Sequence, residues 1–469
     1  MYQVIHLSAE CFPVAKVGGL GDVAGALPKY LNQAGVPSCL VMPRYNLKWN
    51  AAHVSHSVFE GVCSTEHFNI PFHIVKAAQD TLGFDLYMVD IPGILFRDQV
   101  YGYDDDAFRF IFFQQAVLHW LCSWEQKPSV LHAHDHHCGY AAFMAAHCYD
   151  FHPLRNIKTV FTIHNGLYTA PVPHDYARFF PHFPREVGGL LEWDNRIDPL
   201  ATAIKCSQKV TTVSQGYLQE LQQQQSSYSW LYQEYAYKSF GILNGIDTQV
   251  WDPNTDAYLT HKLSEQNWLG FKQKNKEEIC KRFRFDPNLP LCVFIGRLTG
   301  EKGGDLIAPS VGEFVHQTKG MNFFLLGSGS PNLEDALRHI SGVFPENVAN
   351  YIGYNETLAH EMYAAADFLI MPSFVEPCGL NQMYALRYGT IPIVRSVGGL
   401  KDSVKDFGDF EGYGIRFDQG TVQDILYSLY RAKDLYYSSY TFNHVRALGI
   451  KLDFSWETAV KKYISLYYQ

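Results

Sequence analysis

The side chains best suited to chemistry are single charged residues in glycine-rich loops. Arg297 and Lys302 lie five positions apart in such a loop, directly after an apolar run. Two cations at this spacing suit two phosphate groups, because a guanidinium makes bidentate contacts and an ammonium acts as a point charge. Lys16 precedes Gly18 and Gly19, where a ligand can approach the bare backbone closely. These loops indicate diphosphate binding, with ordinary solvated turns as the alternative.

A lone carboxylate, Glu376, lies between an apolar run and a helix-like segment. The small-residue turn Cys378–Leu380 follows it, and apolar spacing predicts a helix from Asn381 that stops at Gly389. The start of a helix attracts anions, so a carboxylate at this place needs another partner, such as sugar hydroxyls. We interpret the stretch as part of a site for a phosphorylated sugar. The alternative is an ordinary connection between a strand and a helix.

Histidines cluster at the end of another predicted strand. The cluster with its aspartate consists of His132, His134, Asp135, His136 and His137. A metal site is one interpretation, but His132 and His134 share a strand face and have no carboxylate at a defined offset. We therefore expect no metal, and a polar strand end where Asp135 accepts hydrogen bonds from sugar hydroxyls.

His164 and Asn165 follow the next predicted strand and fit the same role, with a structural histidine as the alternative. The sequence contains no defensible Ser-His-Asp arrangement, no G-x-S-x-G motif and no paired carboxylates in one motif. Cations for phosphate, with single carboxylates and histidines for hydroxyls, suit transfer from a sugar nucleotide. In that reaction the diphosphate leaves, and cations stabilise its developing charge.

Length and composition limit the possible classes of protein. A chain of 469 residues is too long for one ordinary core and indicates two or three domains. A formal charge of −9 argues against nucleic acid as the main partner. We expect no membrane partner, because no apolar run approaches the roughly 18 residues of a membrane span. Ten cysteines without a CxxC pair, and no secretory signal, are typical of reduced thiols in a cytoplasmic protein.

The predicted elements alternate between strands and helices in two series, which favours two parallel sheets. Residues 53–90 read as antiparallel strands or as a βαβ unit, and residues 168–198 as a long loop with short helices. The segment Val17–Leu20 recurs as Val397–Leu400, each time after a strand. In open α/β sheets, ligands bind beyond the carboxyl ends of the strands, where these polar clusters fall. The pattern therefore predicts two facing domains with a ligand between them.

The motifs, taken together, resemble one family along nearly the whole chain. In chain order they are Lys16–Val23, His132–Asp135, Thr162–Asn165, Asn244–Asp247, Gly296–Thr299 with Lys302-Gly303, Pro372–Leu380 and Val397–Leu400. Each is unspecific alone, but their combination resembles bacterial glycogen synthases and plant starch synthases. These are retaining glucosyltransferases of the GT-B type. The resemblance implies an α/β fold of two facing Rossmann-like domains with parallel sheets and an active-site cleft between them.

The resemblance also implies a division of the chain. Residues 1–243 would form an N-terminal Rossmann-like domain of the starch synthase catalytic type, on the acceptor side. Residues 244–454 would form a C-terminal Rossmann-like domain on the ADP-glucose side. Residues 455–469 would form a final amphipathic helix that crosses back onto the N-terminal domain.

By this resemblance the chain would transfer glucose from ADP-glucose to the non-reducing 4-OH of an α-1,4-glucan, either glycogen or a maltooligosaccharide. Configuration would be retained, and neither metal nor cofactor would be needed. Arg297 and Lys302 would hold the diphosphate, Glu376 the glucose hydroxyls and Tyr354 the adenine. The implied catalytic residues are Glu376, Arg297, Lys302 and His164. The implied substrate-binding residues are Lys16, Gly18, Gly19, Asp135, Asn165, Asn244, Tyr354, Cys378, Gly379 and Leu380.

Three positions depart from the family pattern. His136 stands where the family usually has Trp, and Gly166 where Leu or Ile commonly follows the His-Asn pair. The segment Pro199–Thr202 lacks an expected lysine. Two alternatives remain open: a related retaining enzyme that uses UDP-glucose or another acceptor, such as a sucrose-type synthase, and a glycan-binding protein without catalysis. The phosphate-binding cations argue against the second alternative.

Overall fold

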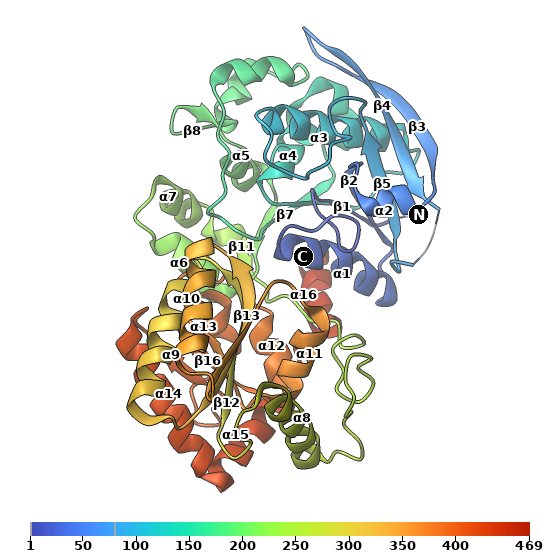
Figure 1. Cartoon of the computed structure of the whole chain (residues 1–469). Helices are drawn as coiled ribbons and strands as arrows, with labels where there is room; N and C mark the ends of the chain where they lie inside the picture. Colours follow the sequence, from blue (N-terminus) through green and yellow to red (C-terminus); the bar gives the residue numbers. More distant parts are fainter. Residues whose placement is uncertain (1, 79–80) are drawn as a thin grey trace. The chain divides into compact units, whose positions relative to one another are not determined.

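The computed structural model describes residues 2–78 and 81–469, so Met1, the first residue of the predicted N-terminal domain, lies outside the described residues. The chain divides into two compact units (Figure 1). The first unit contains Met1–Val213, Leu218–Leu243 and Trp456–Gln469. The second unit contains Ser214–Tyr217 and Asn244–Ser455. Each unit is an α/β structure built around its own sheet, as the two series of strands predict.

The first unit is built on a nine-stranded sheet with the order β11-β10-β7-β6-β1-β2-β5-β4-β3. The strands are β1 (Val4–Leu7), β2 (Ser38–Pro43), β3 (Ser55–Ser64), β4 (Asn69–Ala77), β5 (Asp85–Asp90), β6 (Val130–His134), β7 (Lys158–Ile163), β10 (Lys209–Thr212) and β11 (Ser239–Gly241). Neighbouring strands from β11 to β5 pair in parallel, whereas β4 and β3 run antiparallel. The carboxyl ends of the parallel strands therefore lie along one edge, where the predicted polar residues follow them.

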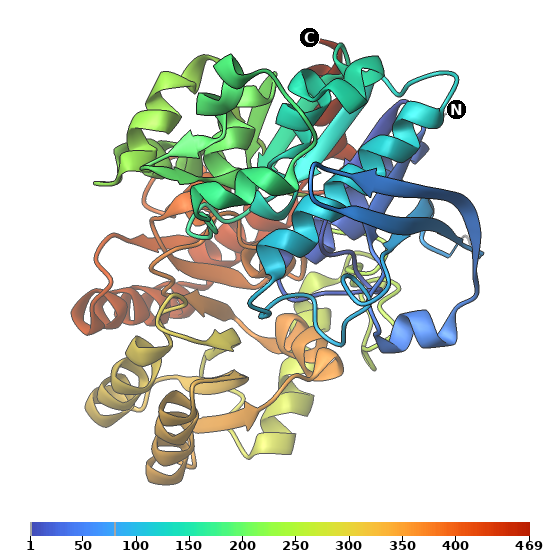
Figure 2. The same cartoon turned by 90° about the horizontal axis from the view of Figure 1, so that it is seen from above.

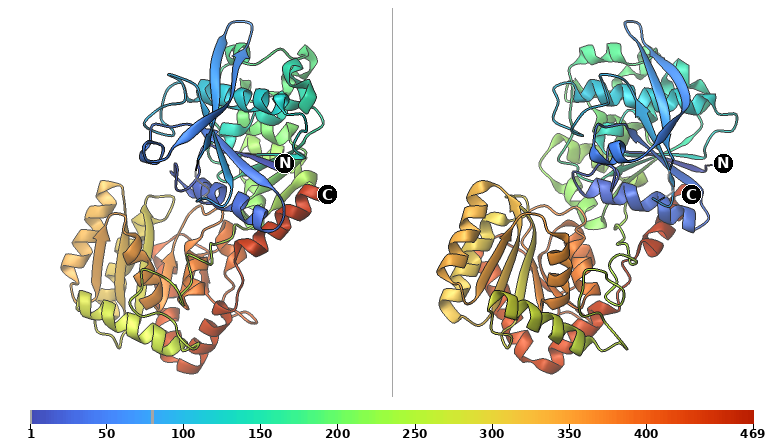
Figure 3. Two further views of the ribbon diagram at one scale, coloured as in Figure 1. Left: turned by 90° about the vertical axis from the view of Figure 1, so that its right-hand side faces the viewer. Right: turned by 45° about the vertical axis from the view of Figure 1, so that its right-hand side comes forward.

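The helices of this unit, apart from α16, lie in the connections between its strands. They are α1 (Gly19–Gln33), α2 (Lys48–Ala52), α3 (Asp106–Ser123), α4 (Ala141–His147), α5 (Pro199–Cys206), α6 (Gln215–Gln223), α7 (Ser227–Glu234) and α16 (Trp456–Tyr468), with the 3-10 turns η1 (His136–Cys138), η2 (Tyr149–Leu154) and η5 (Ala236–Lys238). Helix α6 begins within the short segment that belongs to the second unit. Helix α16 lies beside α1, although they stand at opposite ends of the chain (Figure 3).

The structure defines two stretches whose secondary structure the sequence left ambiguous. Residues 53–90 form antiparallel strands rather than a βαβ unit, and α3 packs against β3 (Figure 2). The predicted long loop at residues 168–198 contains the short turns η3 (His174–Phe179) and η4 (Arg185–Leu190). It also contains a small hairpin of β8 (Glu192–Trp193) and β9 (Arg196–Ile197), which the sequence pattern did not predict.

The second unit is built on a six-stranded parallel sheet with the order β14-β13-β12-β15-β16-β17. The strands are β12 (Leu291–Leu298), β13 (Asn322–Gly329), β14 (Val348–Ile352), β15 (Phe368–Met371), β16 (Ile391–Arg395) and β17 (Ile415–Phe417). The helices are α8 (Trp268–Phe283), α9 (Gly304–Thr318), α10 (Pro331–Val343), α11 (Glu356–Ala365), α12 (Asn381–Arg387), α13 (Gly398–Ser403), α14 (Val422–Tyr437) and α15 (Ser439–Ile450). Apolar side chains pack on both faces of the sheet, in two separate clusters of buried residues.

The segment around Glu376 has the predicted form of strand, loop and helix. Strand β15 ends at Met371, and α12 begins at Asn381. Gly389 follows α12 with a φ of 72°, a left-handed conformation that favours glycine at a helix end. The apolar spacing thus placed these boundaries correctly, whereas β17, α14 and α15 were not assigned from the sequence.

Candidate functional site

In the first unit, the predicted glycine loop folds around a carboxylate. The backbone N–H groups of Val17 and Gly18 donate to Oε2 of Glu10 at 2.6 and 2.9 Å. The hydroxyl of Tyr101 donates to Oε1 of the same residue at 3.0 Å. Glu10 is only 4% exposed and lies three residues after the end of β1. Sequence reasoning missed Glu10, although its place beyond the carboxyl end of a parallel strand was a usable signal.

The glycines themselves leave room beside the loop. A Cβ atom added at Gly18 or Gly19 would meet no heavy atom within 4 Å. Lys16 lies 2.7 Å from a carboxylate oxygen of Asp22, with 42% of its side chain exposed. The ammonium is therefore accessible to a ligand, and its ion pair is of the weak, solvent-screened kind.

Asp135 and His164 lie together at the ends of the adjacent strands β6 and β7. Oδ1 of Asp135 accepts the backbone N–H of His164 at 2.7 Å and that of Asn165 at 3.4 Å. Asp135 has a φ of 55°, which is uncommon for a residue with a side chain. Burial raises the pKa of its carboxyl to about 7, and the nearby Glu10 adds to the shift. The structure thus gives Asp135 a role in shaping the His164–Asn165 backbone, which the sequence did not predict.

In the second unit, the predicted cation and carboxylate are in direct contact. Nζ of Lys302 lies 2.8 Å from both carboxylate oxygens of Glu376. Ser373 donates to Oε2 of Glu376 at 3.0 Å, and Glu376 is 7% exposed. The contact forms because β12 and β15 are neighbours, so the loops after their carboxyl ends meet. The two loops pack tightly at Gly303, since a Cβ added there would lie 2.3 Å from the carbonyl oxygen of Pro372.

Arg297 lies on β12 of the same unit but is more open. Its side chain is 60% exposed, and its nearest acidic atom is Oε2 of Glu301 at 4.0 Å. Glu301 also lies 3.9 Å from the ammonium of Lys302. The two predicted phosphate-binding cations therefore share one acidic neighbour, and Arg297 is the more accessible of the two.

The turn after Glu376 is held by backbone and amide hydrogen bonds. Nε2 of Gln382 donates to the carbonyl oxygens of Cys378 and Gly379 at 3.1 and 3.0 Å. Gly379 has a φ of 71°, and the turn ends at Leu380, which precedes α12. Burial raises the pKa of the Cys378 thiol to about 12, so the sulfur is a neutral thiol at pH 7. We infer that Cys378 contributes its backbone rather than a nucleophile.

The remaining two predicted residues of the second unit lie in different surroundings. Asn244 is buried, its backbone bonds to the Cys378 thiol, and its side-chain oxygen has no hydrogen-bond partner among the described residues. A buried acceptor without a partner is costly, so Asn244 fits a place beside a ligand. Tyr354, by contrast, is 83% exposed and its hydroxyl donates to the carboxylate of Glu356.

Comparisons with known proteins agree with this fold. Residues 3–234 match the model of the starch synthase catalytic domain, and residues 275–432 match that of glycosyl transferases group 1. A protein named glycogen synthase from Flavobacterium johnsoniae is 45% identical, covering 99% of this chain and 98% of its own. Another, from Bacillus anthracis, is 34% identical, covering 99% of each chain.

Solved structures give the same result. The catalytic domain of starch synthase IV from Arabidopsis thaliana, bound to ADP and acarbose, is 31% identical. It matches with a TM-score of 0.85 and covers 100% of this chain and 99% of its own. A sucrose-phosphate synthase from Thermosynechococcus elongatus has a TM-score of 0.63 at 15% identity, which supports the fold alone.

Two Rossmann-like units with a cation–carboxylate pair at the strand ends define a glycosyltransferase of the GT-B class. Within this class, the chain belongs to the family of glycogen synthases and starch synthases. The structural findings add that none of the described helices is long and apolar enough to cross a membrane.

Proposed function

We propose that this chain transfers glucose from ADP-glucose to the non-reducing 4-OH of an α-1,4-glucan, with retention of configuration. The observation that carries the proposal is the Lys302–Glu376 pair, in which the cation that we assign to phosphate and the carboxylate that we assign to the sugar lie side by side. The ADP bound in the starch synthase IV structure supports the choice of nucleotide.

In the proposed reaction, the second unit binds the donor. Arg297 and Lys302 contact the diphosphate and stabilise the charge that develops as it leaves. Glu376 then accepts hydrogen bonds from glucose hydroxyls, together with the backbone of the Cys378–Leu380 turn. The buried oxygen of Asn244 accepts a further hydrogen bond, and Tyr354 stacks on the adenine. Lys302 and Glu376 neutralise each other in the ligand-free protein, which lowers the cost of holding both charges partly buried.

We also assign residues of the first unit to substrate binding. Lys16, with Gly18 and Gly19, is proposed to contact the donor, and His164 and Asn165 are proposed to contact the transferred sugar. Asp135 holds the backbone of His164 and Asn165 in place. The mechanism proposed here uses neither metal nor cofactor, and we place the reaction in the cytoplasm.

The test is incorporation of radiolabelled glucose into glycogen, with ADP-glucose and UDP-glucose offered in parallel. We expect efficient transfer from ADP-glucose, and NMR of the first product should show the α-anomer. Preferential turnover of UDP-glucose would overturn the proposed donor. Binding of maltooligosaccharide without any transfer would favour the glycan-binding alternative.

A further inference from the structure

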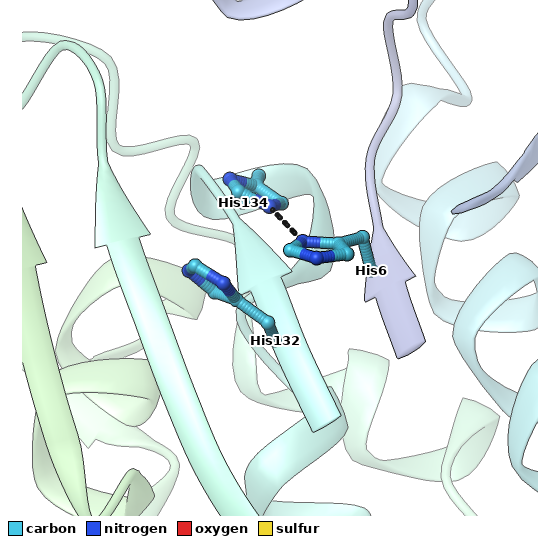
Figure 4. A group of neighbouring side chains, drawn as sticks. All are labelled: His6, His132 and His134. Atoms are coloured by element: carbon cyan, nitrogen blue, oxygen red, sulfur yellow. Dashed lines mark hydrogen bonds between the residues drawn. The ribbon is translucent and has the colours of Figure 1, made fainter. Parts of the chain in front are cut away.

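Three buried histidines of the first unit form a hydrogen-bonded chain that ends at His164. Nε2 of His164 lies 3.0 Å from Nδ1 of His134, and Nε2 of His134 lies 3.1 Å from Nδ1 of His6. His6 and His134 are fully buried, and His164 is 8% exposed. The chain crosses the adjacent strands β7, β6 and β1 at their carboxyl ends, and Figure 4 shows the His6–His134 contact. Sequence reasoning treated His132 and His134 as a polar strand end and missed His6.

A metal is the first alternative, because His6, His132 and His134 each offer a ligand atom within 4.8 Å of the others. Five of their six ring nitrogens are already committed to hydrogen bonds, however, and only Nε2 of His6 has no partner in the part of the chain that the structure describes. His132 bonds to the hydroxyls of Tyr467 and Thr162 at 2.7 and 2.6 Å, and both nitrogens of His134 bond to other histidines. The rings of His132 and His134 are also stacked face to face at 4.2 Å rather than turned edge-on toward one point. A metal would have to break these bonds, so the geometry favours a hydrogen-bonded chain.

The protons along the chain have only two possible arrangements. Burial lowers the pKa of His6 and His164 to about 3 and that of His134 well below its usual value, so each ring is neutral at pH 7. A neutral imidazole has one N–H and one bare nitrogen, so each hydrogen bond fixes the next tautomer along the chain. All donors therefore point either from His6 toward His164 or in the reverse direction.

The end of the chain at His6 decides between the two arrangements. Nε2 of His6 is buried and has no partner among the described residues. In the reverse order this atom would carry an N–H without an acceptor, which is the rarer kind of buried unpaired group. In the forward order it is a bare nitrogen, His6 donates from Nδ1 to His134, and His134 donates from Nδ1 to His164. The proton of His164 then lies on Nδ1.

We propose that His6 and His134 are positioning residues that lock His164 in the Nδ1–H tautomer, so that its ring offers an N–H donor to a sugar oxygen. The tautomer lock stands on the hydrogen-bonded chain alone, and only the sugar contact rests on the proposed function. Because the other ring nitrogen of His164 is held by His134, the orientation of the ring is fixed as well.

The experiment is NMR of the full chain labelled with 15N-histidine, which distinguishes the two tautomers by the shifts of the ring nitrogens. The His164 signals are assigned by their loss in His164→Gln. The wild type should show His164 protonated on Nδ1. In His6→Leu, which removes the first donor, His164 should become a mixture of tautomers. In His6→Asn, whose amide nitrogen occupies about the position of Nδ1, the wild-type tautomer should return.

His132→Phe is the matched control, because His132 is equally buried on the same strand as His134 but is not a member of the chain. It should lower stability and leave the His164 tautomer unchanged. Turnover should fall about 10- to 100-fold in His6→Leu, which is the usual loss when a residue that orients an active-site side chain is removed. It should recover in His6→Asn.

Three results would overturn the proposal: an Nε2–H tautomer in the wild type, an unchanged tautomer in His6→Leu, or one equivalent of bound zinc in the purified protein. Absence of glucose transfer by the wild type would instead reject the proposed function. In that event the NMR result still decides whether the tautomer is locked.

Discussion

At the scale of single residues, the carboxyl of Asp135 links stability to pH. Its pKa is about 7 in the folded chain against 3.8 for an ordinary aspartate, so the folded state binds the proton more tightly. Between pH 4 and 7 the folded state therefore loses stability as pH rises, by up to about 1.4 kcal/mol per pH unit, and the full penalty remains above pH 7. Asp135→Asn keeps an acceptor for the N–H of His164 but cannot ionise. We expect the variant to gain stability over the wild type progressively from pH 5 to pH 7.

Urea denaturation at pH 5, 6, 7 and 8 checks this expectation for the first unit. The control for the loss of a surface carboxylate is Asp104→Asn, at an exposed aspartate of the same unit. A gain for Asp135→Asn that is the same at every pH would mean that Asp135 does not titrate in this range.

Glu376 carries the prediction for turnover. Glu376→Ala removes the proposed partner of the sugar and leaves Lys302 without its contact at 2.8 Å. The kcat/KM for ADP-glucose should fall 100-fold or more, about 3 kcal/mol. Ser373→Ala removes only one hydrogen bond to Glu376 and should cost about 1 kcal/mol. Steady-state kinetics on both variants, with melting temperatures to confirm folding, tests the ranking, and near-normal turnover of Glu376→Ala contradicts the assignment.

Residue types and spacing located the cations and the carboxylate of the second unit but not all of their partners. Glu376 and Lys302 follow strands that the apolar pattern revealed, and their meeting depends only on two strands being neighbours. The contact of Glu10 with Val17 and Gly18 gave no such signal, because it depends on the path of a loop. A histidine inside the apolar run of β1 reads as core, so His6 gave no signal either.

At the scale of elements, the repeated Val-Gly-Gly-Leu segment serves two different purposes. In α13, the N–H of Gly399 donates to the carbonyl oxygen of Glu376 at 3.0 Å. A Cβ added at Gly399 would lie 2.1 Å from the carbonyl oxygen of Cys378, so the helix must pack directly on this turn. At the start of α1, Gly18 has open space beside it. The sequence showed the repetition but not this difference, because the packing depends on a loop 20 residues earlier in the chain.

The two glycines should therefore respond differently to substitution by alanine. Gly399→Ala forces the backbone of α13 or of the Cys378 turn to shift, so we expect a loss of about 1–3 kcal/mol in stability. Gly18 has a φ of −142°, which alanine adopts easily, so Gly18→Ala should melt like the wild type. Its KM for ADP-glucose should rise, since the added methyl group occupies the proposed approach to the donor. Calorimetry and kinetics on both variants would contradict this account if Gly18→Ala proved the less stable one.

At the scale of the whole molecule, the last helix of the chain completes the core of the first unit. Helix α16 buries Trp456, Val460 and Tyr463 in a cluster with residues of α1, and Trp456 stacks with Tyr30. Near the end of α16, the carbonyl oxygen of Tyr467 accepts a hydrogen bond from the ammonium of Lys158 at 2.7 Å. Amphipathic spacing predicted this helix. It did not predict that the hydroxyl of Tyr467 would bond to His132, which is 335 positions away in the sequence. The core of the first unit therefore depends on a segment that follows the whole of the second unit in the sequence.

Loss of a buried side chain from α16 should consequently weaken the first unit and spare the second. Tyr463 is fully buried, so Tyr463→Ala should cost about 3–5 kcal/mol, as for other large aromatic residues in a core. Tyr468, five positions later on the same helix but 62% exposed, provides the control, and Tyr468→Ala should be nearly neutral. Hydrogen exchange distinguishes the units: amides of β1 and β6 should lose protection in Tyr463→Ala, while those of β12 and β15 keep theirs. Equal loss in both sheets would show that α16 stabilises the chain as one cooperative body, and loss confined to β12 and β15 would assign the helix to the second unit.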